Sequence, residues 1–268
     1  MGKLGILAGG GRAPHQLVKT CRDMGRSFFV FGLESHVDED LATDAIIPLG
    51  KTQIFKDICA RENITEIIML GRVRRPSVAE LQPDLLGLKL LAKIGLNMFG
   101  DDGLLRALSD GIEKECQVKV ISAADVFKDF LTPEGILTKA APDAQAQEDI
   151  TRAIEIAQTL GKLDIGQAVI VQQGIVLGVE AIEGTDELIA RAGMLKRQGA
   201  GGVLVKLAKP QQDNRFDLPA IGPDTIQGAK KAGLVGIALE AERSLIIDKQ
   251  ATLEKADKAG LFVIGLKL

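Results

Sequence analysis

Short apolar runs alternate with segments of helical spacing through the first half of the chain. The run at residues 3–8 ends in Gly9-Gly10-Gly11, the pattern of a buried parallel strand that feeds a tight turn. The pattern predicts further strands over 27–33, 45–48, 66–70 and 118–121, and helices over 14–24, 54–62, 85–99 and 103–115. Because strands that alternate with helices are typical of a parallel α/β sheet, we expect one here.

The alternation stops between residues 131 and 149. Two prolines, a glycine and a run of Ala, Gln and Asp fill this stretch. We therefore predict a linker over 132–149, between a domain over 1–131 and one over 150–268; a long surface loop inside one domain is the alternative. The second half then alternates again, with helices over 149–160, 186–197, 225–232 and 251–259, and strands over 168–172, 175–181, 202–207, 234–238, 244–247 and 261–266. This pattern predicts a second α/β domain with a mixed sheet.

Length and composition narrow the function classes. A chain of 268 residues favours two domains. The net charge of −3 gives no general affinity for polyanions, and the absence of Trp and Tyr leaves few platforms for stacking bases, so we expect no nucleic-acid partner. Three scattered cysteines without CxxC spacing are typical of reduced thiols in a cytoplasmic protein. No run approaches the ~20 apolar residues of a spanning helix, so any membrane contact is expected to be peripheral.

Acidic and basic side chains gather at turns between residues 180 and 225. Glycines and prolines mark these turns, and apolar runs flank them. Carboxylate oxygens hold hard cations such as Mg²⁺, while lysine and arginine neutralise phosphate charge that the ion leaves uncovered. The stretch therefore predicts a site for a divalent metal and a phosphate, with a solvated polar surface as the alternative. Its charged members include Glu180, Glu183, Asp186, Lys206, Lys209, Asp213, Arg215, Asp217 and Asp224.

The glycine turn after the first predicted strand is a second candidate site. Gly10, Gly11 and Arg12 stand where backbone N–H groups and a helix N-terminus can meet a phosphate. A dinucleotide fingerprint would need a third glycine where Pro14 stands, so we disfavour NAD as a ligand. A turn with a purely structural role is the alternative.

Two further positions in the first half carry candidate ligand contacts. Arg72 follows the predicted strand over 66–70, and an arginine at a strand carboxyl end is well placed to bind an anion. A solubilising basic loop is the alternative. Asp101 and Asp102 either cap the helix that follows them or contact a sugar hydroxyl.

The apolar helix over 85–99 is expected in the core or at an oligomer interface. A basic and strongly apolar helix can also meet acyl chains or a membrane surface. His15 and His36 lie far apart and lack metal-ligand spacing, so we expect no histidine chemistry.

Several longer motifs resemble one known family. They include Gly71-Arg72-Val73, Gly100-Asp101-Asp102, Glu180-Ala181-x-Glu183-Gly184-Thr185-Asp186 and Arg215-x-Asp217-Leu218-Pro219. Over nearly its whole length the chain is similar to the LpxI-type UDP-2,3-diacylglucosamine pyrophosphatases of Gram-negative lipid A biosynthesis. The resemblance implies a Rossmann-like N-terminal half and a distinct C-terminal half, with the substrate held between them. It also implies a Mg²⁺-dependent hydrolase that yields UMP and 2,3-diacylglucosamine 1-phosphate.

The same resemblance places the family's essential aspartate at Asp217. We expect Asp217 to bind Mg²⁺ or to orient the attacking water, with Glu183 and Asp186 as candidate partners. Further positive charge would come from Lys206, Lys209 and Arg215. The expected substrate contacts are Gly10, Gly11, Arg12, Arg72, Asp101, Asp102, Gly184, Thr185 and Asp213.

The resemblance also bears on partners and location. We expect a cytoplasmic homodimer that takes a lipid-linked UDP-sugar and touches the inner membrane only peripherally. A non-catalytic nucleotide- or lipid-binding module is the alternative function, and magnesium-dependent release of UMP separates the two.

Overall fold

The computed structural model describes residues 2–74, 81–94, 101–126, 128–210, 215 and 218–268. The chain divides into two compact units. The first unit contains the described residues up to Val126 together with Arg215, and the second contains the others from Lys128 onward. No helix in the described ranges is long and apolar enough to cross a membrane.

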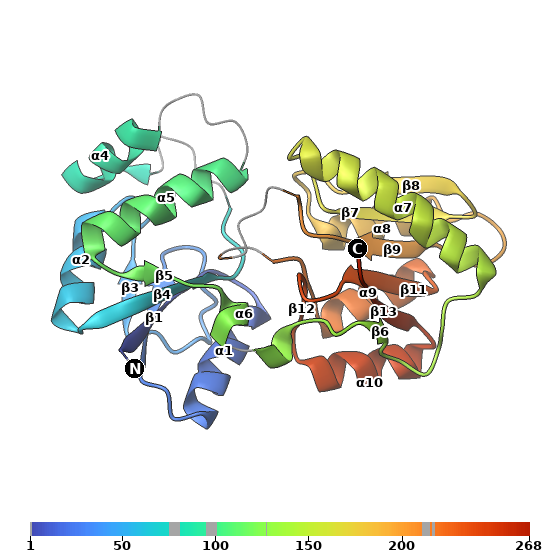
Figure 1. Ribbon diagram of the computed structural model, residues 1–268, viewed down its shortest axis with the longest axis horizontal. Coiled ribbons are helices and arrows are strands. Elements are labelled where there is room, and N and C mark those ends of the chain that lie inside the picture. The colour runs from blue at the N-terminus through green and yellow to red at the C-terminus, as the bar shows by residue number, and fades with distance from the viewer. Residues whose placement is uncertain (1, 75–80, 95–100, 127, 211–214, 216–217) are drawn as a thin grey trace. The chain divides into compact units, whose positions relative to one another are not determined.

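A five-stranded parallel sheet forms the centre of the first unit (Figure 1). Its strands are β1 (Lys3–Ala8), β2 (Phe28–Leu33), β3 (Ala45–Ile47), β4 (Ile64–Leu70) and β5 (Lys119–Val120). They are ordered β3-β2-β1-β4-β5, and every neighbouring pair is parallel. This order, with crossover helices between strands, confirms the Rossmann-like prediction.

Helices cover both faces of this sheet. They are α1 (Arg12–Asp23), α2 (Thr52–Arg61), α4 (Leu85–Ile94), α5 (Asp101–Cys116) and the short α6 (Ala123–Val126). Phe55 of α2 and Ile112 of α5 pack in one buried cluster with Phe31 and Ile67 of the sheet. Figure 1 shows α1 on the other side of the sheet from α5. The predicted helix over 85–99 is confirmed as far as Ile94, and residues 95–99 lie outside the described part of the chain.

The second unit has a six-stranded mixed sheet, as the sequence predicted. Its strands are β6 (Gly135–Ile136), β7 (Ala168–Gln172), β8 (Ile175–Val179), β9 (Val203–Lys206), β11 (Gly236–Glu240) and β13 (Phe262–Leu266), ordered β6-β13-β11-β9-β7-β8. β9, β11 and β13 run parallel to one another. β6 pairs antiparallel with β13, and β7 pairs antiparallel with both β8 and β9. A separate parallel pair joins β10 (Ala220–Ile221) to β12 (Leu245–Ile246).

Four helices pack on the two faces of the six-stranded sheet. They are α7 (Ala144–Lys162), α8 (Thr185–Met194), α9 (Pro223–Ala232) and α10 (Lys249–Ala259). α7 buries Ala153 and Ala157 against Val169 and Val205. α8 and α9 bury Leu188 and other side chains in a separate cluster on the opposite face. Figure 1 shows α7 and α10 on opposite sides of the sheet. The carboxyl ends of β9 and β11 therefore form an edge between two helical layers.

The stretch over 132–149 differs from the predicted linker. Its described residues belong to the second unit. Gly135 and Ile136 form β6, which adds an antiparallel edge strand to β13. α7 begins at Ala144 because the Asp143 side chain accepts a hydrogen bond from the Ala146 N–H at 2.8 Å. The polar composition of the stretch reflects an edge strand and a helix cap.

Candidate active site

A buried polar chain lies at the carboxyl edge of the second sheet. Lys206, the last residue of β9, donates through Nζ to Thr185 Oγ1 at 2.8 Å and to the Ala220 carbonyl at 3.2 Å. Thr185 Oγ1 in turn donates to Glu180 Oε1 at 2.5 Å. Glu180 also accepts from the Gln167 N–H at 3.2 Å. These hydrogen bonds link two predicted site residues, Lys206 and Thr185.

The burial of Lys206 makes its ammonium group a candidate for binding an anion. Lys206 is 7% exposed and Glu180 is 6% exposed. Among the residues that the structure describes, no carboxylate forms a direct ion pair with the Lys206 ammonium. An ammonium group held out of water in this way attracts an anion strongly, because burial of an unpaired charge is costly. Two of its three N–H bonds are used, so the third can donate to a ligand oxygen.

The first turn of α8 adds to the attraction for anions. Gly184 is its N-cap, with φ of 82°, and no side chain accepts a hydrogen bond there. A Cβ atom at Gly184 would meet open space, so lack of room does not require glycine here. The positive φ does, because glycine adopts it without strain. Free N–H groups and the helix dipole favour negative charge at such an end. The predicted contacts Gly184 and Thr185 thus lie beside the Lys206 ammonium.

Glu183 has an arginine partner. Its carboxylate accepts from Arg191 Nη2 at 2.6 Å and from the Ala181 N–H at 3.1 Å. A hydrogen bond from its own backbone lowers the pKa of Glu183, and the Arg191 hydrogen bond lowers it further. Asp186 lies in the first turn of α8. Asp217 and Asp213, with which the two acids were expected to act, lie outside the described residues.

Two other predicted cations form ion pairs of their own. Lys209 Nζ lies 2.5 Å from Asp164 Oδ1, and both side chains are largely buried. Arg215 belongs with the first unit, where it lies 3.2 Å from Asp110 and 3.4 Å from Glu113, both on α5. Of these predicted cations, Lys206 is the one that donates a hydrogen bond to Thr185 within the second unit.

A pocket of about 350 Å³ opens on the same edge of the second sheet. Lys162 and Arg243 line it together with Leu207 and Glu240, which stand at the ends of β9 and β11. Glu240 is fixed in place because it accepts from the Ala208 N–H at 2.9 Å and from Arg243 at 2.9 Å. The pocket combines two cationic side chains, one carboxylate and apolar side chains, and Arg243 is paired with Glu240.

The glycine turn of the first unit uses its N–H groups internally. Gly9 donates to the Leu70 carbonyl, Gly10 donates to the Arg72 carbonyl, and Gly11 donates to Asp38 Oδ2 at 2.9 Å. A Cβ atom at Gly9 would lie 2.6 Å from the Arg72 carbonyl oxygen. The glycines therefore permit close backbone packing, the structural alternative that the sequence left open. A phosphate at this turn would instead meet the N–H groups of the α1 first turn, which begins at Arg12.

Arg72 falls at the strand end as predicted, whereas the aspartate pair lies inside the following helix and does not precede it as a cap. Arg72 follows β4 and forms an antiparallel bridge with Gly10, which fixes its backbone beside the glycine turn. Asp101 and Asp102 are the first residues of α5, and their side chains lie outside the described part. Arg72 thus lies near Gly11 in the first unit, since its guanidinium would be 3.5 Å from a Cβ atom there.

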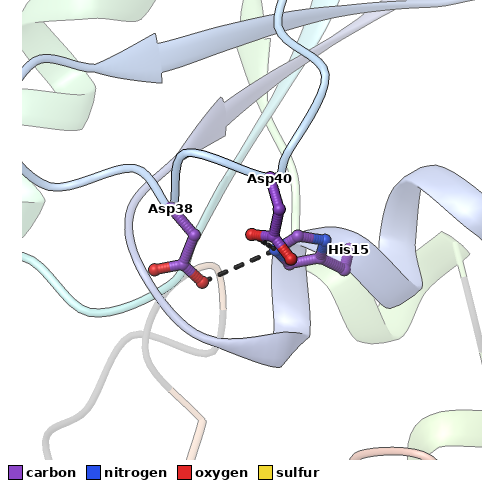
Figure 2. A group of neighbouring side chains, drawn as sticks. All are labelled: His15, Asp38 and Asp40. Atoms are coloured by element: carbon purple, nitrogen blue, oxygen red, sulfur yellow. Dashed lines mark ion pairs between the residues drawn. The ribbon is translucent and has the colours of Figure 1, made fainter.

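Histidine contacts were not expected from the sequence. His15 of α1 lies beside Asp38 and Asp40, which are on the segment between β2 and β3 (Figure 2). Residue spacing could not show this, because the two segments meet only once β1 and β2 pair. The available signal was their shared position: both follow strand carboxyl ends, and parallel neighbours end at the same edge. Glu180 is the other residue that the sequence did not assign to a site, although it was named in the charged stretch.

Comparison with known proteins agrees with the resemblance. Residues 3–130 match the model of the LpxI N-terminal domain, and residues 133–264 match that of the LpxI C-terminal domain. The chain is 41% identical to the UDP-2,3-diacylglucosamine pyrophosphatase LpxI of Caulobacter vibrioides, over 99% of this chain and 98% of that protein. A solved structure of CobK precorrin-6A reductase shares 13% identity with a TM-score of 0.32, over 100% of this chain and 88% of that one, too weak a likeness to carry an argument. With both domain models matched and such identity over nearly its full length, the chain belongs to the LpxI family.

Proposed function

We propose that this protein hydrolyses the diphosphate of UDP-2,3-diacylglucosamine to UMP and 2,3-diacylglucosamine 1-phosphate. The observation that carries the proposal is the 41% identity, over 99% of the chain, to a protein described as the pyrophosphatase for that substrate. A relative of this similarity over both domains supports the same reaction here. The expected class is a hydrolase of lipid A biosynthesis.

The buried cation supports this chemistry on physical grounds. A diphosphate carries its negative charge on oxygens that need several donors at once. The Lys206 ammonium and the uncapped start of α8 offer such donors side by side. Because Glu180 holds Thr185 and Thr185 holds Lys206, the ammonium is positioned before substrate arrives. We therefore assign Lys206 to binding a phosphate oxygen whose charge grows during the displacement.

Magnesium belongs to the proposal as a cofactor. When bound, it would neutralise charge on the diphosphate oxygens. The described residues fit it in part: Asp186 lies in the first turn of α8, but the Glu183 carboxylate is paired with Arg191 at 2.6 Å. Glu183 would have to release Arg191 before it could bind an ion. Asp217 is the third proposed ligand.

The lipid part of the substrate would need apolar surface. On α4, Leu85 is 81% exposed and Leu88 is 51% exposed, while Leu86 and Leu90 on the same helix are buried. Exposed leucines on a helix that already packs through its other side suit acyl chains, a membrane surface or a second subunit. We propose peripheral membrane contact and a homodimer on this basis, in the cytoplasm, where the three free cysteines would stay reduced.

The test is magnesium-dependent release of UMP from UDP-2,3-diacylglucosamine. The unaltered protein should release UMP only with Mg²⁺ present. Asp217→Ala should lower kcat by at least about 10³-fold while substrate binding persists, and Lys206→Met should lower it by about 10²–10³-fold. Lys231→Met, an exposed change on α9, is the matched control and should retain activity.

Other outcomes would redirect the proposal. Binding of the substrate without release of UMP at any magnesium concentration would favour the non-catalytic binding module. Full activity of Asp217→Ala would show that Asp217 has no catalytic role. The proposed reaction would still stand.

A further inference from the structure

A histidine and two carboxylates converge in the first unit, and none of the three was predicted as a site residue. His15 Nε2 lies 3.5 Å from Asp38 Oδ2 and 3.4 Å from Asp40 Oδ1. One ligand atom from each of the three lies within 4.8 Å of the other two, and the described chain has no other such group of three. Figure 2 shows the Asp38 and Asp40 side chains beside the His15 imidazole. The three side chains therefore surround one small volume.

The fold brings them together at the carboxyl edge of the parallel sheet. His15 lies in the first turn of α1, which follows β1, and the aspartates follow β2, its direct neighbour. Gly10 permits the close approach, because a Cβ atom there would lie 2.8 Å from the His36 carbonyl oxygen. The Gly11 N–H donates to Asp38 Oδ2 at 2.9 Å and orients that carboxylate toward His15. Backbone contacts thus hold one carboxylate in place.

The separations fit ligand atoms around a metal ion better than they fit hydrogen bonds. A nitrogen and an oxygen joined by a good hydrogen bond stand about 2.9 Å apart. Two ligand atoms about 2.0–2.1 Å from a tetrahedral ion stand about 3.4 Å apart. Adjacent ligands of octahedral Mg²⁺ stand about 2.9 Å apart. The distances of 3.4 and 3.5 Å from His15 Nε2 are close to those between two ligands of a tetrahedral ion, and they also lie within the 4 Å of an ion pair.

Ligand chemistry points the same way. Mg²⁺ and Ca²⁺ take oxygen ligands, whereas an imidazole nitrogen with carboxylates suits zinc and other first-row ions. The geometry points to a binding site for a zinc-class divalent ion at His15, Asp38 and Asp40. Asp40 is 85% exposed, so a fourth position is open to water or to an oxygen of a ligand at the glycine turn. This inference uses the first unit alone and does not rest on the proposed hydrolysis.

The competing interpretation is an ion pair in which a protonated imidazole sits between two carboxylates. It predicts a pairing that needs no metal and a surface that binds divalent ions only weakly. The two interpretations differ in whether the full chain takes up a stoichiometric transition-metal ion through His15.

The experiment is a Co²⁺ titration of the full-length protein without a polyhistidine tag, after treatment with EDTA. We expect one ion per chain, the visible absorption of tetrahedral cobalt, and its loss when Zn²⁺ is added. His15→Ala and Asp40→Asn should each weaken binding by more than about tenfold, the loss already seen when only an outer-shell partner of a ligand is removed. Asp40 is highly exposed, so its replacement should leave the fold intact.

The chain contains its own matched control. His36, the second of two histidines, contacts the Glu34 and Arg74 carbonyls and lies outside the group, so His36→Ala should bind cobalt as the unaltered protein does. Equal titration of the two histidine variants would overturn the site. Binding through a cysteine, recognised by thiolate-to-cobalt charge-transfer absorption, would overturn it too. Absence of a tetrahedral spectrum at stoichiometric cobalt would leave only the ion pair.

Discussion

At the scale of single residues, burial separates the cations that can act on a ligand from those that stabilise the fold. Lys206 and Lys209 both lie near the end of β9, and both are largely buried. Lys209 has the Asp164 carboxylate at 2.5 Å, so much of its charge is already neutralised. Lys206 has a hydroxyl and a carbonyl as its partners. It therefore retains a positive charge for an incoming anion, and we expect Lys209 to contribute mainly to stability.

The cysteines allow a prediction about pH. Burial raises the pKa of the Cys59 thiol to about 12, with Cys116 adding to the rise, and burial raises the pKa of Cys116 to about 11. At about pH 8 the thiolate fraction of both should be very low, so reaction with a disulfide reagent should be at least about a hundredfold slower than in the unfolded chain. Thiol counting in native buffer and in guanidinium checks this expectation.

The sign of the linkage follows from the same shifts. A folded-state pKa above the ordinary value of 9.0 means that folding favours the protonated thiol. This contribution is fully present below 9.0 and is lost as pH rises through 11 and 12. The free energy of unfolding should therefore fall on going from neutral to strongly alkaline buffer. A thiol that reacts in native buffer at its unfolded rate would contradict the assigned burial.

At the scale of elements, one carboxylate joins a helix to a hairpin. Asp149 of α7 is 1% exposed and accepts from the Gln173 N–H at 2.8 Å and the Gly174 N–H at 2.7 Å. These two residues form the tip between β7 and β8, and both have positive φ, as two-residue hairpin turns require. The side chain thus satisfies N–H groups of a turn that α7 covers.

Removing that carboxylate should be costly. Asp149→Ala would remove the side-chain acceptor of the Gln173 and Gly174 N–H groups, so we expect a loss of about 1–3 kcal/mol in the free energy of unfolding, measured by urea denaturation. Asp149→Asn keeps one acceptor oxygen and should lose less. Glu148→Ala, an exposed neighbour on the same helix, is the control and should change stability by less than about 0.5 kcal/mol. Equal stabilities for Asp149→Ala and the control would contradict the role given to Asp149.

Periodicity predicted the long elements well, for a physical reason. Strands such as β1 and β7 are buried on both faces, so they read as continuous apolar runs whatever surrounds them. The edge strand β6 was missed because it has two residues and depends on pairing with β13. The start of α7 was missed because its cap, Asp143, precedes a polar first turn. Whether a short element forms depends on non-local pairing and on caps, and the periodicity of apolar residues shows neither.

At the scale of the whole molecule, the structure shows contacts of the predicted site residues that the motifs did not indicate. Lys206 and Thr185 were both expected at the site, and the structure joins them by a hydrogen bond. Glu183 was expected to hold a metal, yet Arg191 from the next two turns of α8 reaches back to it. His15 was set aside because it lies far from His36 and lacks metal-ligand spacing, yet its partner Asp38 follows more than twenty residues later in the chain. Sequence spacing shows local partners, whereas sheet order decides distant ones.

Arg215 lies two residues before Asp217 in the chain, so contacts that fix Arg215 also restrict where Asp217 can lie. Arg215 belongs with the first unit, although Pro210 and Leu218 on either side belong with the second. It lies 3.2 Å from Asp110 and 3.4 Å from Glu113, and Glu113 is itself held by the Val120 N–H at 2.8 Å. We expect this ion pair to position the segment that leads to Asp217, since misplacement of a reacting group by about 1 Å is costly.

Replacing either side of the ion pair should then have the same effect on activity. Arg215→Ala should lower kcat/KM by about tenfold or more, and so should the double variant Asp110→Asn with Glu113→Gln, which retains an acceptor for Val120. Combining all three changes should cost no more than either alone, because they break one interaction. Stability should change by less than about 1 kcal/mol, as for other exposed pairs. If the double variant of α5 keeps full activity while Arg215→Ala loses it, Arg215 acts on the substrate directly and the positioning role is wrong.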